Sequence, residues 1–208
     1  MGNEKLNCII VGGAPVKGDP FCGLEPGFLI CADGGLDTAL QFGKKPDLVI
    51  GGFDSAKAAP PQGAEVIRLK KEKDDTDTMA AIKEGIRRGY RDFTLLGATG
   101  GRLDHTFANL SALQYLVSQG CRAVIAEPDG RIFLMPGGRL TLSKMLGSTV
   151  SVFPFGGAMC VVSYEGMKYP LAEQPLYSEM PLGVSNEIVS DSAQIIVHSG
   201  NALVFVLS

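Results

Sequence analysis

Hydrophobic positions in the first 128 residues follow two alternating patterns. Short apolar runs rich in Val, Ile and Leu, ended by Gly or Asp, predict buried strands at residues 7–13, 28–35, 47–52, 65–69, 92–101 and 121–130. Helical patterns lie between them at residues 36–43, 78–89 and 103–120, and the last has an apolar face made of Leu103, Phe107, Leu110, Leu113 and Val117. This alternation predicts an α/β fold, with a mostly parallel sheet and flanking helices.

The pattern changes after Gly130. Short strand patterns at hairpin-like spacing, separated by turn signals, follow at residues 131–138, 139–143, 148–157, 159–166, 187–192, 193–200 and 202–208. Because no long helical pattern occurs among them, this part predicts an all-β sandwich or a small barrel. We therefore expect an α/β domain at residues 1–128 and a β-sandwich at residues 129–208, with Tyr169 and Leu171 in the sandwich core.

Composition limits the classes of protein to consider. Hydrophobic residues make up 45% of the 208 residues, charged residues 20%, and the net charge is −3, which supports a packed core. No block of Lys and Arg stands out, which argues against binding to nucleic acid or to a membrane surface. The five cysteines are odd in number and widely spaced, as expected for core residues in a reducing compartment. The apolar runs are too short to span a bilayer, so we expect a soluble cytoplasmic protein.

Aspartates follow the ends of the predicted strands: Asp33, Asp54, Asp74, Asp77 and Asp104. Ligands of an open parallel sheet bind beyond the carboxyl ends of the strands, so these side chains should lie along one edge. One such Asp is usually a turn or cap residue, but clustered carboxylates need a cation, and Mg²⁺ prefers carboxylate oxygens. In the segment KDDTD, residues 73–77, helix capping explains one or two acids, whereas three favour a metal site.

A Gly-rich segment, GATGGRLDH at residues 97–105, follows the fifth predicted strand. Its backbone N–H groups can approach phosphates, and Arg102 supplies a planar fork of donors for phosphate oxygens. Asp104 can also be read as a helix N-cap, and His105 as a half-buried helix residue. The dinucleotide fingerprint needs a third Gly where the chain has Leu103, and no P-loop motif occurs, so phosphate binding by the Gly loop and Arg102 is the favoured interpretation.

Six motifs together resemble the thiamin pyrophosphokinase family. They are ADGG (32–35), IGGFDS (50–55), KDDTD (73–77), GGRLDHTFANL (100–110), GMKYPL (166–171) and VSNE (184–187). Each is weak alone, but they occur in the family's order and cover nearly the whole chain. The resemblance implies a nucleotide-binding α/β domain followed by a β-sandwich. It also implies a homodimer that binds thiamin between one subunit's first domain and the other's second. The implied reaction moves the pyrophosphoryl group of ATP to the thiamin hydroxyl, giving thiamin diphosphate and AMP.

The resemblance also implies roles for individual residues. Asp54, Asp74 and Asp77 would hold Mg²⁺ and the phosphates, and the catalytic residues would be Asp77, Asp54 and Arg102, with Asp77 nearest the thiamin hydroxyl. The implied ATP contacts are Asp33, Gly34, Gly35, Thr99, Gly100, Gly101, Arg102, Asp104 and His105. Ser185 and Asn186 would face thiamin, although a β-turn in a sandwich loop is the simpler interpretation of those two residues.

The chain departs from the family pattern at Gly52, where the third-strand motif usually carries an additional Asp. A single carboxylate there would weaken Mg²⁺ binding unless Asp74, Asp75 and Asp77 compensate. Two other functions compete with the family's reaction: a non-catalytic nucleotide or thiamin sensor on the same fold, and a nicotinamide-dependent reductase. The sensor differs only in whether the metal site is complete, whereas the reductase lacks its fingerprint Gly and acid.

Overall fold

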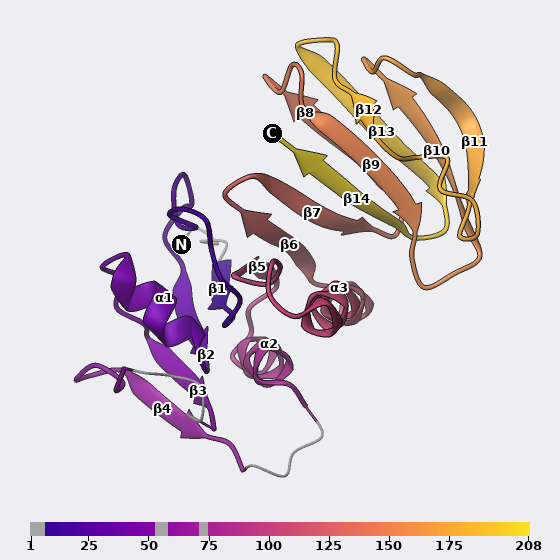
Figure 1. Ribbon diagram of the computed structural model, residues 1–208. Coiled ribbons are helices and arrows are strands. Elements are labelled where there is room, and N and C mark those ends of the chain that lie inside the picture. The colour runs from indigo at the N-terminus through magenta and orange to yellow at the C-terminus, as the bar shows by residue number, and fades with distance from the viewer. Residues whose placement is uncertain (1–6, 53–57, 71–74) are drawn as a thin grey trace, which may run out of the picture. The chain divides into compact units, whose positions relative to one another are not determined.

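The computed structural model of the protein describes residues 7–52, 58–70 and 75–208 (Figure 1). The chain divides into two compact units, Met1–Pro128 and Asp129–Ser208. Both units have the architecture expected from the hydrophobic pattern: the first combines a parallel sheet with helices, and the second is built from antiparallel strands.

The described residues of the first unit form six strands in the order β6-β5-β1-β2-β3-β4, and every neighbouring pair is parallel. The strands are β1 (Asn7–Val11), β2 (Phe28–Ala32), β3 (Leu48–Gly51), β4 (Glu65–Arg68), β5 (Asp92–Leu96) and β6 (Arg122–Glu127). Four consecutive residues are buried in each of β1, β2, β3 and β5, as expected for a parallel sheet covered on both faces.

Helices cover both faces of this sheet. Helix α1 (Gly35–Gln41) packs Leu36 and Ala39 against a cluster that includes Ile9 of β1. Helix α2 (Asp77–Arg87) brings Gly85 against Cys8, which points to the other face because strand side chains alternate. The Thr76 Oγ1 caps α2 by accepting a hydrogen bond from the Met79 N–H at 3.1 Å, so the end of KDDTD does start a helix.

Helix α3 (Leu103–Ser118) buries a different face from the one expected. Its buried residues are Asn109, Ala112, Leu113 and Leu116, of which only Leu113 belonged to the predicted face. Leu103 is 83% exposed and Phe107 is 62% exposed. The prediction was wrong for the first turns because that end of α3 lies beside a cavity, where polar residues are needed on the inward side. None of the helices in the described part of the chain is long and apolar enough to cross a membrane.

The second unit is a sandwich of two antiparallel sheets, ordered β12-β9-β14-β7 and β11-β10-β13-β8. Both sheets contribute to one core: Val150 and Val204 come from the first, and Val162 and Ile195 from the second. The strands are β7 (Gly130–Met135), β8 (Gly138–Ser143), β9 (Thr149–Pro154), β10 (Met159–Glu165), β11 (Leu171–Tyr177), β12 (Asn186–Glu187), β13 (Ser192–Ser199) and β14 (Ala202–Leu207).

Three details of the sandwich differ from expectation. Strand β11 was not predicted, and the strand expected at 187–192 is reduced to the two residues of β12. Leu171 packs against the core as predicted, whereas Tyr169 is 61% exposed and lies outside it. All five cysteines are free, and four are buried as expected, but Cys22 is exposed. Burial raises the pKa of the Cys8 and Cys31 thiols to about 12, so both stay protonated.

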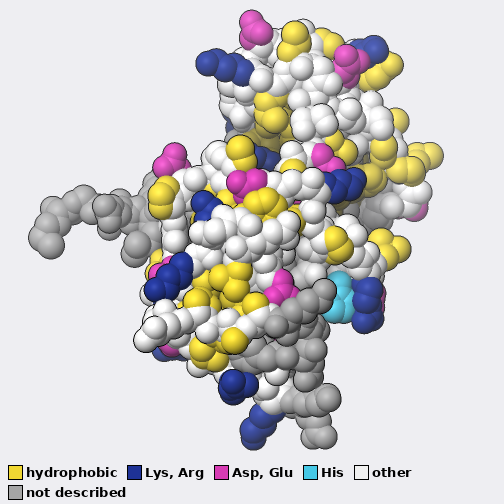
Figure 2. All heavy atoms as spheres, turned by 60° about the vertical axis from the view of Figure 1, so that its left-hand side comes forward, with side chains coloured by type: hydrophobic (Ala, Val, Ile, Leu, Met, Phe, Trp, Pro, Cys, Tyr) yellow, Lys and Arg dark blue, Asp and Glu magenta, His cyan; other side chains and the backbone are white. Residues whose placement is uncertain are grey.

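The surface agrees with the balanced composition. On the face shown in Figure 2, Lys and Arg side chains are interspersed with Asp and Glu, and no block of one sign covers the coloured part of the surface.

Candidate active site

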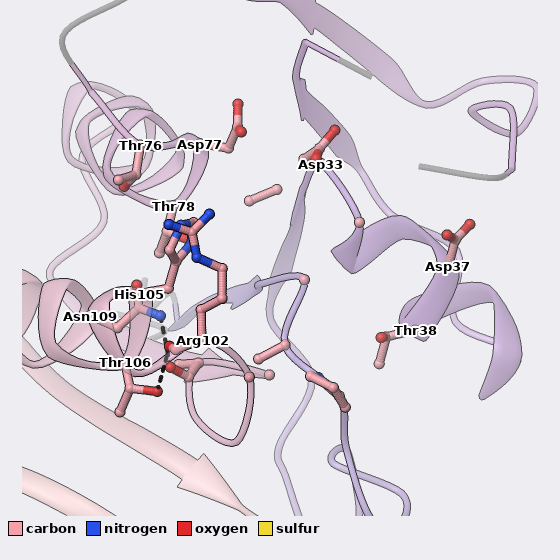
Figure 3. Close-up of a pocket in the computed structure, with 18 residues that line it drawn as sticks. Asp33, Asp37, Thr38, Thr76, Asp77, Thr78, Arg102, His105, Thr106 and Asn109 are labelled. Atoms are coloured by element: carbon pink, nitrogen blue, oxygen red, sulfur yellow. Dashed lines mark hydrogen bonds between the residues drawn. The ribbon is translucent and has the colours of Figure 1, made fainter. Parts of the chain in front are cut away.

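A cavity of about 680 Å³ lies in the first unit, beyond the carboxyl ends of β1, β2 and β5 (Figure 3). Four segments form it: the loop after β1, the turn from β2 into α1, the start of α2, and the β5–α3 loop with the first turns of α3. This is the edge of the sheet where ligands of open α/β folds bind. Its polar lining residues are Asp33, Asp37, Thr38, Thr76, Asp77, Thr78, Arg102, His105, Thr106 and Asn109.

Asp33 forms the turn that leads from β2 into α1. Its N–H donates to the Ile50 carbonyl at 2.9 Å, its carbonyl accepts from the Leu36 N–H at 3.1 Å, and its φ of 45° lies in the left-handed region. Non-glycine residues seldom adopt that region, and they cluster at functional sites. The Oδ1 atom of Asp33 is buried and accepts no hydrogen bond from any residue that the structure describes. A bound cation or donor would satisfy it, because an unpaired buried acceptor is costly.

The acids of KDDTD have different surroundings. Asp77, in the first turn of α2, lines the cavity. Asp75 instead forms an ion pair with Lys83 at 2.7 Å, with 36% of its side chain exposed, and it does not line the cavity. This contact gives Asp75 a partner on α2, outside the cavity lining. Asp74 lies outside the described residues, as does Asp54.

Arg102 stands at the start of α3 and lines the cavity. Figure 3 shows its guanidinium group at the same opening as the carboxylates of Asp33 and Asp77. Its Nε and Nη2 atoms also donate to the Asp104 carboxylate at 3.1 and 2.6 Å. This fork raises the pKa of Arg102 and lowers the pKa of Asp104. Because both side chains are mostly exposed, the pair adds little stability and can open for a phosphate.

The Gly-rich loop between β5 and α3 is held from behind. The N–H groups of Ala98 and Thr99 donate to the same Oε1 of Glu127, at 3.0 and 3.1 Å. The Ala98 carbonyl accepts from Nδ2 of the buried Asn109 at 2.7 Å. Two amides of the loop are therefore directed at a carboxylate, and Gly97, Ala98 and Gly101 of the loop line the cavity.

Asn186 and Ser185 lie in the sandwich. Asn186 is 5% exposed; its Oδ1 accepts from the N–H groups of Tyr169 and Glu187, and its Nδ2 donates to the Tyr169 carbonyl at 2.8 Å. Ser185 is exposed at φ 59°, with its N–H donating to the Ser151 Oγ at 3.0 Å. Asn186 thus connects the start of β12 with the bend that contains Tyr169, and Ser185 lies at the surface.

The cavity brings together part of the predicted site: Asp33, Gly34, Asp77, Gly101, Arg102 and His105. Four other predicted ATP contacts do not line it: Gly35, Thr99, Gly100 and Asp104. Within the described ranges no group of three or more potential metal ligands occurs, and Asp54 and Asp74 lie outside those ranges. The sequence interpretation missed Asp37, Thr38, Asn109 and Glu127. Asn109 could have been identified from the sequence, because this residue belongs to the motif GGRLDHTFANL.

A parallel sheet with acids, an arginine and a Gly-rich loop at its carboxyl edge, followed by a β-sandwich, defines an α/β enzyme that handles phosphate groups. Family models agree: one described as thiamin pyrophosphokinase, catalytic domain, matches residues 25–125, and one described as thiamin pyrophosphokinase, vitamin B1 binding domain, matches residues 139–204. The chain belongs to the thiamin pyrophosphokinase family. It is therefore a kinase-type transferase, and the family's reaction is pyrophosphoryl transfer from ATP to thiamin.

Individual relatives extend over most of the chain. Thiamine pyrophosphokinase of Bacillus subtilis is 28% identical over 170 residues, which cover 77% of this chain and 78% of the relative. Thiamin pyrophosphokinase 1 of Caenorhabditis elegans is 24% identical over 191 residues, covering 86% and 77%. The crystal structure of the Bacillus subtilis enzyme aligns with a TM-score of 0.85 at 23% identity, covering 97% and 99% of the two chains. That from Geobacillus thermodenitrificans aligns with a TM-score of 0.80 at 26% identity, covering 98% of each chain.

Proposed function

We propose that pyrophosphoryl transfer from ATP to the thiamin hydroxyl, giving thiamin diphosphate and AMP, takes place in the cavity of the first unit. The observation that carries this proposal is the convergence of Asp33, Asp77 and Arg102, from three separate segments, on one cavity. Its volume of about 680 Å³ suits a nucleotide-sized ligand.

Residues of the cavity have separate roles in the proposed reaction, according to their charge and size. Arg102 would exchange its exposed contact with Asp104 for phosphate oxygens, since a guanidinium binds either anion through the same fork. Gly101, having no side chain, would let phosphate approach the backbone. Asp77 would accept the proton of the thiamin hydroxyl as its oxygen attacks the β-phosphorus and AMP leaves. Little covalent work remains, because positioning and charge neutralisation dominate phosphoryl transfer.

Mg²⁺ is part of the proposal, and the described residues fit it. Asp33, whose buried Oδ1 has no hydrogen-bond partner among the described residues, lines the same cavity as Asp77, and hard carboxylate oxygens are the ligands that Mg²⁺ prefers. Asp33 and Asp77 would hold the ion together with Asp54 and Asp74. When bound, the ion would neutralise phosphate charge.

A shared site in a homodimer is also part of the proposal. The family model for vitamin B1 binding covers the second unit, whereas the catalytic model and the cavity belong to the first. Ser185 and Asn186 are the residues proposed to lie nearest thiamin. Analytical ultracentrifugation would measure the dimer. The cytoplasmic location stays a prediction from the sequence.

Release of AMP tests the function directly. AMP should appear from ATP only when thiamin is present, together with an equal amount of thiamin diphosphate. A sensor would bind the same ligands without forming AMP. A nicotinamide-dependent reductase would instead oxidise its reduced cofactor in the presence of a substrate, so the two assays separate the three functions.

Arg102→Lys should lower kcat/KM for ATP about tenfold or more. Lysine keeps the charge but loses the planar fork that grips two phosphate oxygens at once. Arg122→Lys is a matched control, because Arg122 forms a similar fork with Asp92 at the other edge of the sheet. An unchanged kcat/KM for Arg102→Lys would remove this residue from the phosphate site.

Gly52→Asp should lower the Mg²⁺ concentration needed for half-maximal activity and raise kcat. Gly52 directly follows β3 and is exposed. Residues 52 and 54 share an orientation if the strand continues, and two carboxylates would then face the ion. A titration of activity with Mg²⁺ measures the effect. If neither quantity changes, position 52 lies beyond the reach of the metal, and the assignment of Asp54 as a ligand loses its main support.

A further inference from the structure

Glu127 is the last residue of β6 and has no part in the chemistry proposed above, yet its carboxylate reaches the Gly-rich loop. One oxygen, Oε1, accepts hydrogen bonds from two successive N–H groups, those of Ala98 and Thr99. The acceptor and the two donors are separated by 29 and 28 residues along the chain, so the contact is a product of the fold. Hydrogen bonds to a charged acceptor are about twice as strong as neutral ones.

Neighbouring groups of the same loop are also fixed. Asn109 holds the Ala98 carbonyl, and the Gly97 carbonyl accepts from the Ala14 N–H at 3.0 Å. Gly12 and Gly97 pass so closely that a Cβ on either would lie 2.7 Å from the carbonyl oxygen of the other. The backbone from Gly97 to Thr99 is therefore held by Ala14, Asn109 and Glu127.

Gly97 and Ala98 of this anchored stretch line the cavity themselves, and two further lining residues follow soon after them. Gly100 turns the chain at a φ of 83°, and Gly101 and Arg102 then line the cavity. Without Glu127, the N–H groups of Ala98 and Thr99 would lose their acceptor, and this peptide could rotate. Gly100 would transmit such a rotation, because glycine has little conformational preference of its own.

We infer that Glu127 is a positioning residue for pyrophosphoryl transfer: by accepting from the Ala98 and Thr99 amides it fixes the loop, so that Gly101 and Arg102 present one arrangement to the phosphates of ATP. The inference rests on the proposed function of the cavity. It assigns Glu127 no contact with substrate. It also means that the Ala98 and Thr99 amides serve the loop and do not bind phosphate.

Two substitutions of Glu127 separate hydrogen bonding from charge. Glu127→Ala removes the acceptor and should raise KM for ATP about tenfold and lower kcat, because the loop would no longer hold Gly101 and Arg102 in position for the phosphates. KM for thiamin should change less than twofold. Glu127→Gln keeps an oxygen at the same place and should restore most of the loss. Asp92→Ala is the matched control, because Asp92 is a carboxylate at the opposite edge of the sheet that pairs with Arg122.

Amide hydrogen exchange, followed by NMR, reads the loop itself. The Ala98 and Thr99 amides should exchange slowly in the wild type and in Glu127→Gln, and much faster in Glu127→Ala. If Glu127→Ala does not fold, Glu127→Asp replaces it, since a side chain shorter by one methylene keeps the charge but withdraws the acceptor. Unchanged exchange or an unchanged KM for ATP in the truncated variant overturns the inference, and so does a Glu127→Gln variant as impaired as Glu127→Ala.

The AMP assay on the wild type separates failure of the proposed function from failure of the inference about Glu127. A wild type that forms no AMP from ATP and thiamin would refute that function. The inference would then be decided by amide exchange together with the affinity for ATP, which should fall about tenfold in Glu127→Ala and stay near the wild-type value in Glu127→Gln.

Discussion

Asp77→Asn should lower kcat by about a hundredfold or more, the usual contribution of a positioned acid–base group. The substitution preserves the size of the side chain but removes the negative charge that faces the cavity at the start of α2. A neutral amide neither accepts the hydroxyl proton nor holds a divalent ion well. Steady-state release of AMP, measured at saturating ATP, thiamin and Mg²⁺, gives the value.

Asp75→Asn is the matched control for this prediction. Asp75 lies two residues earlier and carries the same charge, but it pairs with Lys83 outside the cavity lining. An exposed ion pair of this kind contributes about 0–1 kcal/mol, so kcat should stay within about twofold of the wild type. Equal losses of kcat in both variants would show that negative charge near the start of α2 matters as a whole, and that Asp77 has no special role.

Gly35→Ala should destabilise the protein by about 3 kcal/mol or more, a loss that marks severe overpacking. A Cβ at Gly35 would lie 1.9 Å from the carbonyl oxygen of Val11, which belongs to a buried strand and cannot move aside. The turn from β2 into α1 would be pushed away from β1, and Asp33 with it. The midpoint of urea unfolding, together with the slope of the transition, measures the loss.

Gly34→Ala provides the comparison. Of the atoms that the structure describes, a Cβ at Gly34 would meet the Gly13 Cα alone, at 3.5 Å, which is an ordinary contact, and the φ of −58° suits any residue. Its free energy of unfolding should stay within about 1 kcal/mol of the wild type. A Gly35→Ala variant as stable as Gly34→Ala would mean that β1 and α1 are farther apart than the structure has them.

The hydrophobic pattern was sufficient to predict the architecture, because strand and helix periods come from local geometry. The prediction failed where tertiary contacts determine which side chains are buried and which segments pair as strands. The first turns of α3 expose Leu103 and Phe107 because this end of the helix borders a cavity. Strand β11 escaped prediction because its segment, LAEQPLY, contains Pro175 and two polar residues, and Glu173 has a φ of 45° within it.

The site was predictable to the extent that chemistry is tied to strand ends. Asp33, Asp77 and Arg102 each follow a strand of a parallel sheet, so topology alone brings them together. Glu127 could not be found in this way. Glu127 accepts a hydrogen bond from a backbone N–H group 28 residues away, and such a backbone contact cannot be predicted from residue types. Asp75 carries the same residue type as Asp77, and only the structure separates their surroundings.

The contact between Asn186 and Tyr169 should respond to solution conditions differently from the ion pair beside it. The amide group of Asn186 both donates to and accepts from the Tyr169 backbone, as a paired strand would. Next to it, Lys168 and Glu187 form an exposed ion pair at 3.2 Å. Salt screens that pair, whereas a buried amide carries no charge. The hydrogen bonds between β12 and the bend at Tyr169 should therefore be equally stable in dilute buffer and in concentrated salt.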